Sequence, residues 1–221
     1  MKRQEQTSPY YPLFLNIRGK QCLVVGGGKV ALRKVQALLE HGAGIEVVSP
    51  TFCRELNQLA QDGAIRTIQK DFNKKDLQDA LIAVAATDDA RTNESVAAEA
   101  RRRGVLVNVV DNPQNSDFIV PSFFRRGDVI VAVSTSGKSP ALARKIRNEL
   151  EKGFKAEYAQ LAVLADGVRS ELKQQGITVS SDAWQEALNL NSLIELLRRG
   201  KNREAKEIML NRLKALEQKK P

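Results

Sequence analysis

Apolar runs alternate with amphipathic stretches along the first 110 residues of the chain. Short apolar runs predict strands, and apolar positions three and four residues apart predict helices. This alternation favours a parallel sheet with helices on both faces. The predicted strands lie at 21–25, 45–48, 65–68, 81–86 and 106–110, and the predicted helices at 30–41, 51–61 and 89–103.

The pattern changes near residue 117. Two apolar runs joined by Arg-Arg-Gly-Asp predict an antiparallel strand pair that turns at Gly127 and Asp128. A helix is expected to follow, with Ser139 as its N-cap and Pro140 in its first turn. The remainder, from about residue 155 to 218, is helical in pattern.

These patterns predict an α/β protein built in three parts. Residues 1–116 form a Rossmann-like nucleotide-binding domain with a parallel sheet, residues 117–153 a β-β-α connector, and residues 154–221 a small helical domain. An apolar content of 42% in 221 residues is sufficient for a sizeable core.

Charge and cysteine content narrow the class of protein. The net charge is +9, and residues 121–221 carry 19 Lys and Arg against 12 Asp and Glu. This imbalance indicates an anionic partner, or only solvated helix faces.

The sequence has neither a nucleic-acid-binding signature nor a membrane-spanning run, so neither a nucleic acid nor a membrane is expected as a partner. The two cysteines are no disulfide framework, and with no signal-peptide pattern we expect a cytoplasmic protein.

The segment VVGGGKVA carries a dinucleotide-binding pattern. Gly26, Gly28 and Ala31 fit G-x-G-x-x-A between a predicted strand and a predicted helix. The first glycine makes a tight turn, the second allows close approach of a pyrophosphate, and the small third residue lets the helix pack on the strand. We expect the three consecutive glycines to admit that pyrophosphate at the helix N-terminus. A tight turn without a ligand is the alternative interpretation.

The ribose-binding part of this pattern is imperfect. An acidic residue is expected about 20 positions further on, at the end of the second strand. Glu46 lies near that spacing but inside the strand, whose end is occupied by Ser49, Pro50 and Thr51. We therefore expect backbone and hydroxyl groups to hold the ribose, and the residues leave NAD and NADP undistinguished.

Polar residues also follow the fourth and fifth predicted strands. Thr87 and Asp88 end the fourth, where capping of the next helix is the favoured role for Asp88. Asn108 and Asp111 lie at the end of the fifth, where a ligand contact and a structural turn are equally open. His41 is expected to contact helix carbonyls rather than to act in catalysis, and no metal site is expected.

Residues 134–138 form a Ser-Thr-Ser-Gly-Lys loop between a predicted strand and a predicted helix. A nucleoside triphosphate-binding loop would need glycine at position 132, where the chain has Ala132. A simple helix cap is one interpretation. We favour a loop of hydroxyls and one lysine beside an anionic substrate.

Several of these segments together resemble a known family. Residues 11–43, with AATDD at 85–89, NVVD at 108–111 and the run at 117–147, are similar to precorrin-2 dehydrogenase. This enzyme of siroheme biosynthesis occurs alone or as the N-terminal half of siroheme synthase. The resemblance implies NAD-dependent oxidation of precorrin-2, a polycarboxylate tetrapyrrole, to sirohydrochlorin. It further implies a stand-alone form without the methyltransferase half. Such a form either works with a separate chelatase or inserts Fe²⁺ itself, as a bifunctional enzyme.

The resemblance also assigns roles to residues. Asp111 is the implied catalytic residue, acting as a general base. A homodimer through the connector, with Phe118, Phe123 and Phe124, is implied as well, and a non-catalytic NAD-sensing module is the remote alternative. The resemblance places NAD contacts at Lys29, Val30, Pro50 and Thr51 and a substrate-side loop at residues 134–138. Together with the motifs above, the expected NAD contacts are Gly26, Gly27, Gly28, Lys29, Val30, Ser49, Pro50, Thr51, Thr87 and Asp88, and the expected substrate contacts are Asn108, Ser134, Thr135, Ser136, Gly137 and Lys138. One relative has serine at the position of Thr135, which keeps the hydroxyl.

Overall fold

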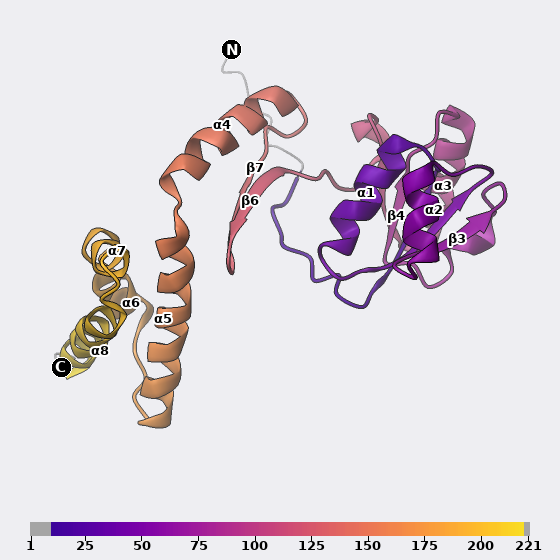
Figure 1. Ribbon diagram of the computed structural model, residues 1–221. Helices are drawn as coiled ribbons and strands as arrows, with labels where there is room; N and C mark the ends of the chain where they lie inside the picture. The colour runs from indigo at the N-terminus through magenta and orange to yellow at the C-terminus, as the bar shows by residue number, and fades with distance from the viewer. Residues whose placement is uncertain (1–9, 219–221) are drawn as a thin grey trace, which may run out of the picture. The chain divides into compact units, whose positions relative to one another are not determined.

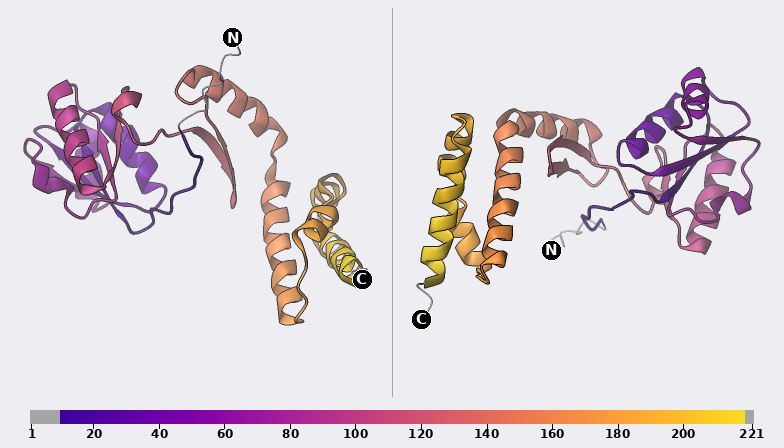
Figure 2. Two further views of the ribbon diagram at one scale, coloured as in Figure 1. Left: turned by 180° about the vertical axis from the view of Figure 1, so that it is seen from behind. Right: turned by 60° about the horizontal axis from the view of Figure 1, so that its bottom comes forward.

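The computed structural model describes residues 10–218, which divide into two compact units (Figure 1, Figure 2). The first unit runs to Val120 and the second begins at Pro121. The predicted α/β class is confirmed, because the first unit holds a parallel sheet with helices. The division into three parts, with boundaries after residues 116 and 153, stays a prediction.

Five parallel strands form the sheet of the first unit, in the order β3-β2-β1-β4-β5. In the central strand β1, Val24 pairs with Val47 of β2 on one side and with Val84 of β4 on the other. The strand order therefore reverses between β1 and β4. The strands are β1 (Gln21–Val25), β2 (Gly44–Ser49), β3 (Arg66–Gln69), β4 (Ile82–Ala85) and β5 (Leu106–Val109), each within one residue of its prediction.

Helices cover both faces of this sheet, because buried side chains of successive strand residues point to opposite sides. Cys22 and Val24 of β1 belong to the core beneath α1 and α2, whereas Leu23 and Val25 belong to the core beneath α3. The helical elements are α1 (Lys29–Leu39), α2 (Arg54–Gln61), α3 (Ala90–Arg103) and the short 3₁₀ helices η1 (Lys74–Leu77) and η2 (Pro113–Asn115).

Two expectations about helix starts were wrong. The second helix begins at Arg54 and not at residue 51, since Cys53 still has extended backbone. Asp89, and not Asp88, caps α3: its carboxylate accepts the N–H groups of Arg91 and Thr92 at 3.2 and 3.0 Å. A capping side chain must stand directly before the first helical residue, and Asp88 is one position too early.

Two helices of the first unit end at glycines, and His41 has the contact expected of it. Gly42 and Gly104 follow α1 and α3 with φ of 75° and 71°, the left-handed backbone in which glycine is favoured. The ring Nδ1 of His41 lies 2.7 Å from the carbonyl oxygen of Ala37, so this histidine contacts a helix carbonyl.

The second unit starts with the antiparallel pair β6 (Ser122–Arg126) and β7 (Val129–Val133), which turns at Gly127 as predicted. Helix α4 (Pro140–Gly153) follows, and the Ser139 hydroxyl accepts the Leu142 N–H at 3.2 Å as the predicted N-cap. Phe124 is buried against Phe154, with ring centroids 5.6 Å apart. Its ring therefore contributes to the core of its own chain.

Four helices of the second unit share one apolar core. One predicted helical stretch is broken near Asn189, whose side chain accepts the Ser192 N–H at 3.2 Å and so starts a new helix. Figure 2 shows α5 and α8 side by side. The four are α5 (Ala156–Gln174), α6 (Ser181–Ala187), α7 (Leu190–Arg198) and α8 (Asn202–Gln218). Between residues 10 and 218, no helix has both the length and the apolar character required to cross a membrane.

The turn between β1 and α1 is in close backbone contact with the loops on either side. A Cβ on Gly26, whose φ is 129°, would overlap the Ala86 carbonyl. One on Gly27 would overlap the Thr51 carbonyl oxygen and lie 2.8 Å from the Ser49 hydroxyl oxygen. The chain's own backbone therefore requires glycine at these two positions. Their expected contact with a cofactor stays a prediction.

Replacement of Gly27 by alanine is expected to destabilise the fold. The added methyl group must displace the backbone at Thr51, and overpacking of this kind costs about 2–3 kcal/mol. Gly28→Ala is the matched control: no atom lies within 4 Å of its Cβ position, so its cost stays below about 1 kcal/mol. Urea unfolding of the two variants measures the difference, and equal stability would show that the close approach is not real.

Candidate functional site

The candidate site lies at the carboxyl edge of the five-stranded sheet. Parallel strands end at the same edge, and open sheets of this class bind ligands where the strand order reverses. Here that place is between β1 and β4. The loops after β1, β2, β4 and β5 all emerge at this edge, so the first-unit residues expected to contact ligands are brought together there.

Gly28 marks the N-terminus of α1 and leaves it open. Its Cβ position has no atom within 4 Å, and no side chain caps the helix. The first turn contains no acidic residue, and Lys29 and Val30 are exposed. A helix start of this kind offers unpaired N–H groups and a partial positive charge to an anion. The pyrophosphate of a dinucleotide fits this position.

The end of β2 presents a hydroxyl and backbone groups. Ser49 is 7% exposed, and Pro50 and Thr51 follow it at the surface. Glu46 lies within the strand and pairs with Arg66 of β3 at 3.3 Å, so its carboxylate is engaged in the sheet. Glu46 therefore does not supply the acidic residue that is typical of a ribose site. The sequence analysis expected this, because Glu46 lies inside the strand and not at its end.

Of the two residues that follow β4, Thr87 forms hydrogen bonds within the fold, whereas Asp88 is exposed at the surface. The Thr87 hydroxyl lies 2.8 Å from Asn93 Oδ1 and accepts the Asp89 N–H at 3.2 Å, so it stabilises the start of α3. Asp88 is exposed. The hydrogen bond from the Thr92 hydroxyl lowers the pKa of Asp89, which keeps the cap ionised. A cofactor contact at Thr87 or Asp88 stays a prediction.

Asp111 stands at the tip of the turn that follows β5. It is exposed and adopts φ of 57°, the left-handed region in which only three non-glycine residues of the described chain are found. Aspartate tolerates this conformation better than most residues, and such backbone often marks functional positions. The structure therefore presents this carboxylate at the sheet edge with a defined backbone geometry.

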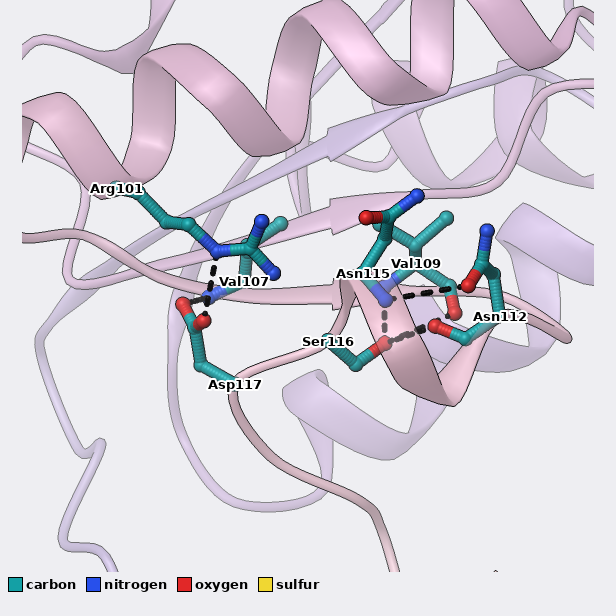
Figure 3. A network of polar contacts seen from close by, with 7 residues as sticks. All are labelled: Arg101, Val107, Val109, Asn112, Asn115, Ser116 and Asp117. Carbon is teal, nitrogen blue, oxygen red and sulfur yellow. Dashed lines mark hydrogen bonds and ion pairs between the residues drawn. The ribbon is translucent and has the colours of Figure 1, made fainter.

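A polar network holds the chain that leaves Asp111 against the edge of β5 (Figure 3). The Ser116 hydroxyl accepts the Val109 N–H at 2.9 Å and donates to the Asn112 carbonyl at 2.8 Å. Asp117 accepts the Val107 N–H at 3.1 Å and pairs with Arg101 at 3.1 Å. These side chains occupy the open edge of β5 and fix the turn that carries Asp111.

Asn108 connects β5 to helix α1. It is 8% exposed, and its amide nitrogen donates to the Phe118 carbonyl at 3.0 Å. That bond orients its amide oxygen, which accepts a hydrogen bond from Lys34 Nζ at 3.4 Å. Phe118 itself packs against the core of the first unit. Asn108 is thus an internal connection, and a direct substrate contact at this residue stays a prediction.

The loop at 134–138 belongs to the second unit. Thr135 has a structural role there: its hydroxyl accepts the Ser139 N–H at 3.0 Å and lies 2.9 Å from the Ser139 carbonyl oxygen. Ser136 has φ of 54°, and its N–H donates to the Ser134 hydroxyl at 3.0 Å. Gly137 and Lys138 are exposed. The part of this loop in substrate binding stays a prediction.

Lys34 is a member of the site that the sequence interpretation missed. It lies on the face of α1 that also carries the buried residues Ala31 and Val35. A charged residue within the apolar face of a helix is the signal that could have identified it. The roles of Ser116 and Asp117 were also missed, because a side chain that bonds a strand edge leaves no periodic pattern.

The arrangement suits the binding of a dinucleotide and of an anionic substrate beside a proton acceptor. An open helix N-terminus can bind a pyrophosphate, an exposed carboxylate can accept a proton, and a half-buried ammonium can attract an anion. These residues fit a nicotinamide dinucleotide. Among residues 10–218 no group of three or more His, Cys, Asp or Glu side chains is arranged to hold a metal ion.

Two sequence families match the chain. Residues 13–122 match a family described as "Putative NAD(P)-binding", and residues 126–153 match one described as "Sirohaem biosynthesis protein central". The first match supports a nicotinamide dinucleotide as the cofactor and leaves NAD and NADP undistinguished.

Curated relatives are named siroheme synthase. The protein of Nitrosococcus oceani is 43% identical over 198 residues, which cover 89% of this chain and 42% of the relative. That of Nitrosomonas europaea is 46% identical over 169 residues, or 76% of this chain and 36% of the relative. The chain thus spans less than half the length of these relatives.

A solved structure resembles the chain over nearly its full length. It is that of SirC, a precorrin-2 dehydrogenase, with a TM-score of 0.70 and 30% sequence identity. The match covers 90% of this chain and 98% of SirC. On this likeness, and on the motifs at residues 26–31 and 108–147, the chain belongs to the precorrin-2 dehydrogenase family.

Proposed function

We propose that the chain oxidises precorrin-2 to sirohydrochlorin with NAD as the oxidant, in the synthesis of siroheme. The likeness to SirC carries this proposal, because it extends over 98% of that enzyme and includes both units of the present chain. The open N-terminus of α1 and the carboxylate of Asp111 lie at one edge of the sheet. The reaction needs an oxidant, which the first can bind, and a proton acceptor, which the second can be.

The reaction removes two hydrogen atoms from the macrocycle. Two electrons and one proton pass to the nicotinamide, which is the chemistry that the cofactor supplies when bound. The second proton leaves to a base. Asp111 takes this role in our proposal, since it is an exposed carboxylate held at the end of β5 by the network around Ser116 and Asp117.

Residues of the first unit bind and orient the cofactor. The N–H groups at the start of α1, from Gly28 to Val30, receive the pyrophosphate, and no side chain competes with it there. The Ser49 hydroxyl and the backbone at Pro50 and Thr51 hold the ribose. Gly26 and Gly27 act indirectly, by allowing the neighbouring loops to approach the turn.

Iron insertion is a second candidate activity. The relatives are named for the synthesis of siroheme, a tetrapyrrole that contains iron. The chain is 43% identical to one of them over most of its own length. A carboxylate that accepts a proton from the macrocycle can also accept protons from pyrrole nitrogens as Fe²⁺ enters. Asp111 could then serve both steps, and otherwise a separate chelatase receives the product.

The proposed assembly is a homodimer formed through the second unit. Leu142, Ile146 and Leu150 are 51%, 39% and 40% exposed and lie at every fourth position of α4, which forms an apolar stripe. Such a stripe supports a protein partner. Phe118 and Phe124, which the sequence suggested for this contact, are already packed within the chain.

An anaerobic assay with purified protein, precorrin-2 and either NAD or NADP tests the function. We expect sirohydrochlorin absorbance to appear with NAD, and a rise in metal uptake after Fe²⁺ is added only if the chain is also a chelatase. Conversion with NADP alone would contradict the choice of NAD. Binding of NAD without conversion of precorrin-2 would favour a sensing module and contradict the proposal.

Asp111→Asn is expected to lower kcat about 100- to 1,000-fold with little change in the KM for NAD, because a neutral amide cannot accept the proton. Asparagine tolerates left-handed backbone, so the fold is retained. The matched control is Asp79→Asn, which changes another exposed aspartate with positive φ, located before β4 at the opposite edge of the sheet. Full activity of Asp111→Asn would exclude Asp111 as the base.

Gly28→Asp is expected to separate stability from cofactor binding. Gly28 has φ of −88°, which aspartate adopts readily, and aspartate is a favoured N-cap. Its carboxylate would occupy the first N–H groups of α1 and repel a pyrophosphate. We expect the thermal midpoint to be unchanged or raised, and the Kd for NAD to increase at least about tenfold. Unaltered NAD affinity, measured by calorimetry beside Gly28→Ala, would place the pyrophosphate elsewhere.

A further inference from the structure

Lys34 is a half-buried cation whose position demands an explanation. It lies on α1 between the buried residues Ala31 and Val35, on the face that packs against the sheet. Lysine side chains at such positions normally extend to solvent, because burial of an ammonium is costly. The side chain of Lys34 instead reaches across to β5, the strand that precedes Asp111.

A chain of hydrogen bonds holds Lys34 in this position. Its Nζ donates to Asn108 Oδ1 at 3.4 Å, and the Asn108 amide nitrogen donates to the Phe118 carbonyl at 3.0 Å. Because Phe118 fixes which end of the amide is the acceptor, the ammonium has a defined location. An ammonium has three donors, so two N–H groups of Lys34 remain for another partner.

The positive charge of Lys34 is not balanced by a carboxylate in direct contact with it. Burial lowers the pKa of Lys34, Arg33 lowers it further, and Asp111 raises it. In the part of the chain that the structure describes, no carboxylate lies within 4 Å of its Nζ, so it has no ion-pair partner of its own. An anionic ligand group beside Nζ would offset both the burial and the repulsion from Arg33.

We propose that Lys34 is a substrate-positioning residue that binds a carboxylate of the tetrapyrrole and places the macrocycle beside Asp111. The inference rests on the proposed function, which it deepens by assigning a substrate contact. A carboxylate is favoured over a cofactor phosphate because Lys34 Nζ is held at Asn108 of β5, whereas the open N–H groups for a pyrophosphate lie at Gly28.

The experiment replaces Lys34 by methionine, which retains the length and the apolar stem and removes the charge. Lys74→Met, at an exposed lysine of η1, is the matched control for loss of one charge. For Lys34→Met we expect the KM for precorrin-2 to rise about 10- to 100-fold, with kcat changed less than about threefold and the KM for NAD unchanged. Lys34→Arg is expected to recover most of the loss.

Binding measurements provide a readout that does not depend on turnover. Quenching of protein fluorescence by sirohydrochlorin gives a Kd, which should weaken by the same factor in Lys34→Met and remain unchanged in Lys74→Met. If wild-type protein binds sirohydrochlorin but does not oxidise precorrin-2, the proposed function fails while this comparison still tests Lys34. Circular dichroism establishes that each variant is folded, and Lys34→Gln replaces Lys34→Met if the latter is not.

Three results would overturn the inference. A weaker affinity for NAD with unchanged tetrapyrrole binding would assign Lys34 to a cofactor phosphate. A fall in kcat with a shifted acid limb of the pH–rate profile, and unchanged tetrapyrrole affinity, would show that Lys34 acts only on the charge of Asp111. Unchanged kinetics and binding would show that its contact with Asn108 has no part in substrate recognition.

Discussion

Close approach of three backbone segments at the carboxyl edge of the sheet is the constraint on which the rest of the site depends. Gly26 contacts the loop after β4 and Gly27 the loop after β2, with no room for a side chain at either position. The N–H of Cys53 donates to the Gly27 carbonyl at 2.7 Å, and this bond holds the loop after β2 against Gly27. Gly28 follows directly as the N-cap of α1, which begins at Lys29 at this edge of the sheet.

The same edge is completed by β5, an outer strand whose free side is bonded by side chains, whereas the inner strands β2, β1 and β4 have a neighbouring strand on each side. Ser116 and Asp117 take up the N–H groups of Val109 and Val107, so the outer edge of the sheet is paired and the following turn is fixed. Asp111 stands at the tip of that turn. The position of a proposed catalytic carboxylate therefore depends on polar residues that contribute nothing to the chemistry themselves.

Much of the first unit follows from the hydrophobic pattern, because a buried parallel strand must be apolar and a covering helix must be amphipathic. The five strands were predictable for this reason. In the second unit, the turn at Gly127 and the cap at Ser139 were predictable from their residue types instead. The position of the α3 cap was not, since Asp88 and Asp89 are equivalent in sequence and only the first helical residue decides between them. The broken helix at Asn189 was likewise hidden in a continuous helical pattern.

The candidate site was predictable where it depends on backbone geometry and not where it depends on contacts between distant residues. Gly28 and Asp111 occupy positions that the order of strands and turns already defines. Lys34 and Asn108 are 74 residues apart, and their contact exists only because α1 and β5 flank the same part of the sheet. The need for Gly27 also arises from a distant segment, the loop at Thr51.

A crystal structure of the protein with NAD and sirohydrochlorin tests the central claim most directly, because it locates both ligands at once. The account predicts the pyrophosphate on the N–H groups from Gly28 to Val30, and the macrocycle at the end of β5, with a carboxylate on Lys34 Nζ and Asp111 facing the ring. A pyrophosphate away from α1, or a macrocycle bound without contact to the end of β5, would contradict it.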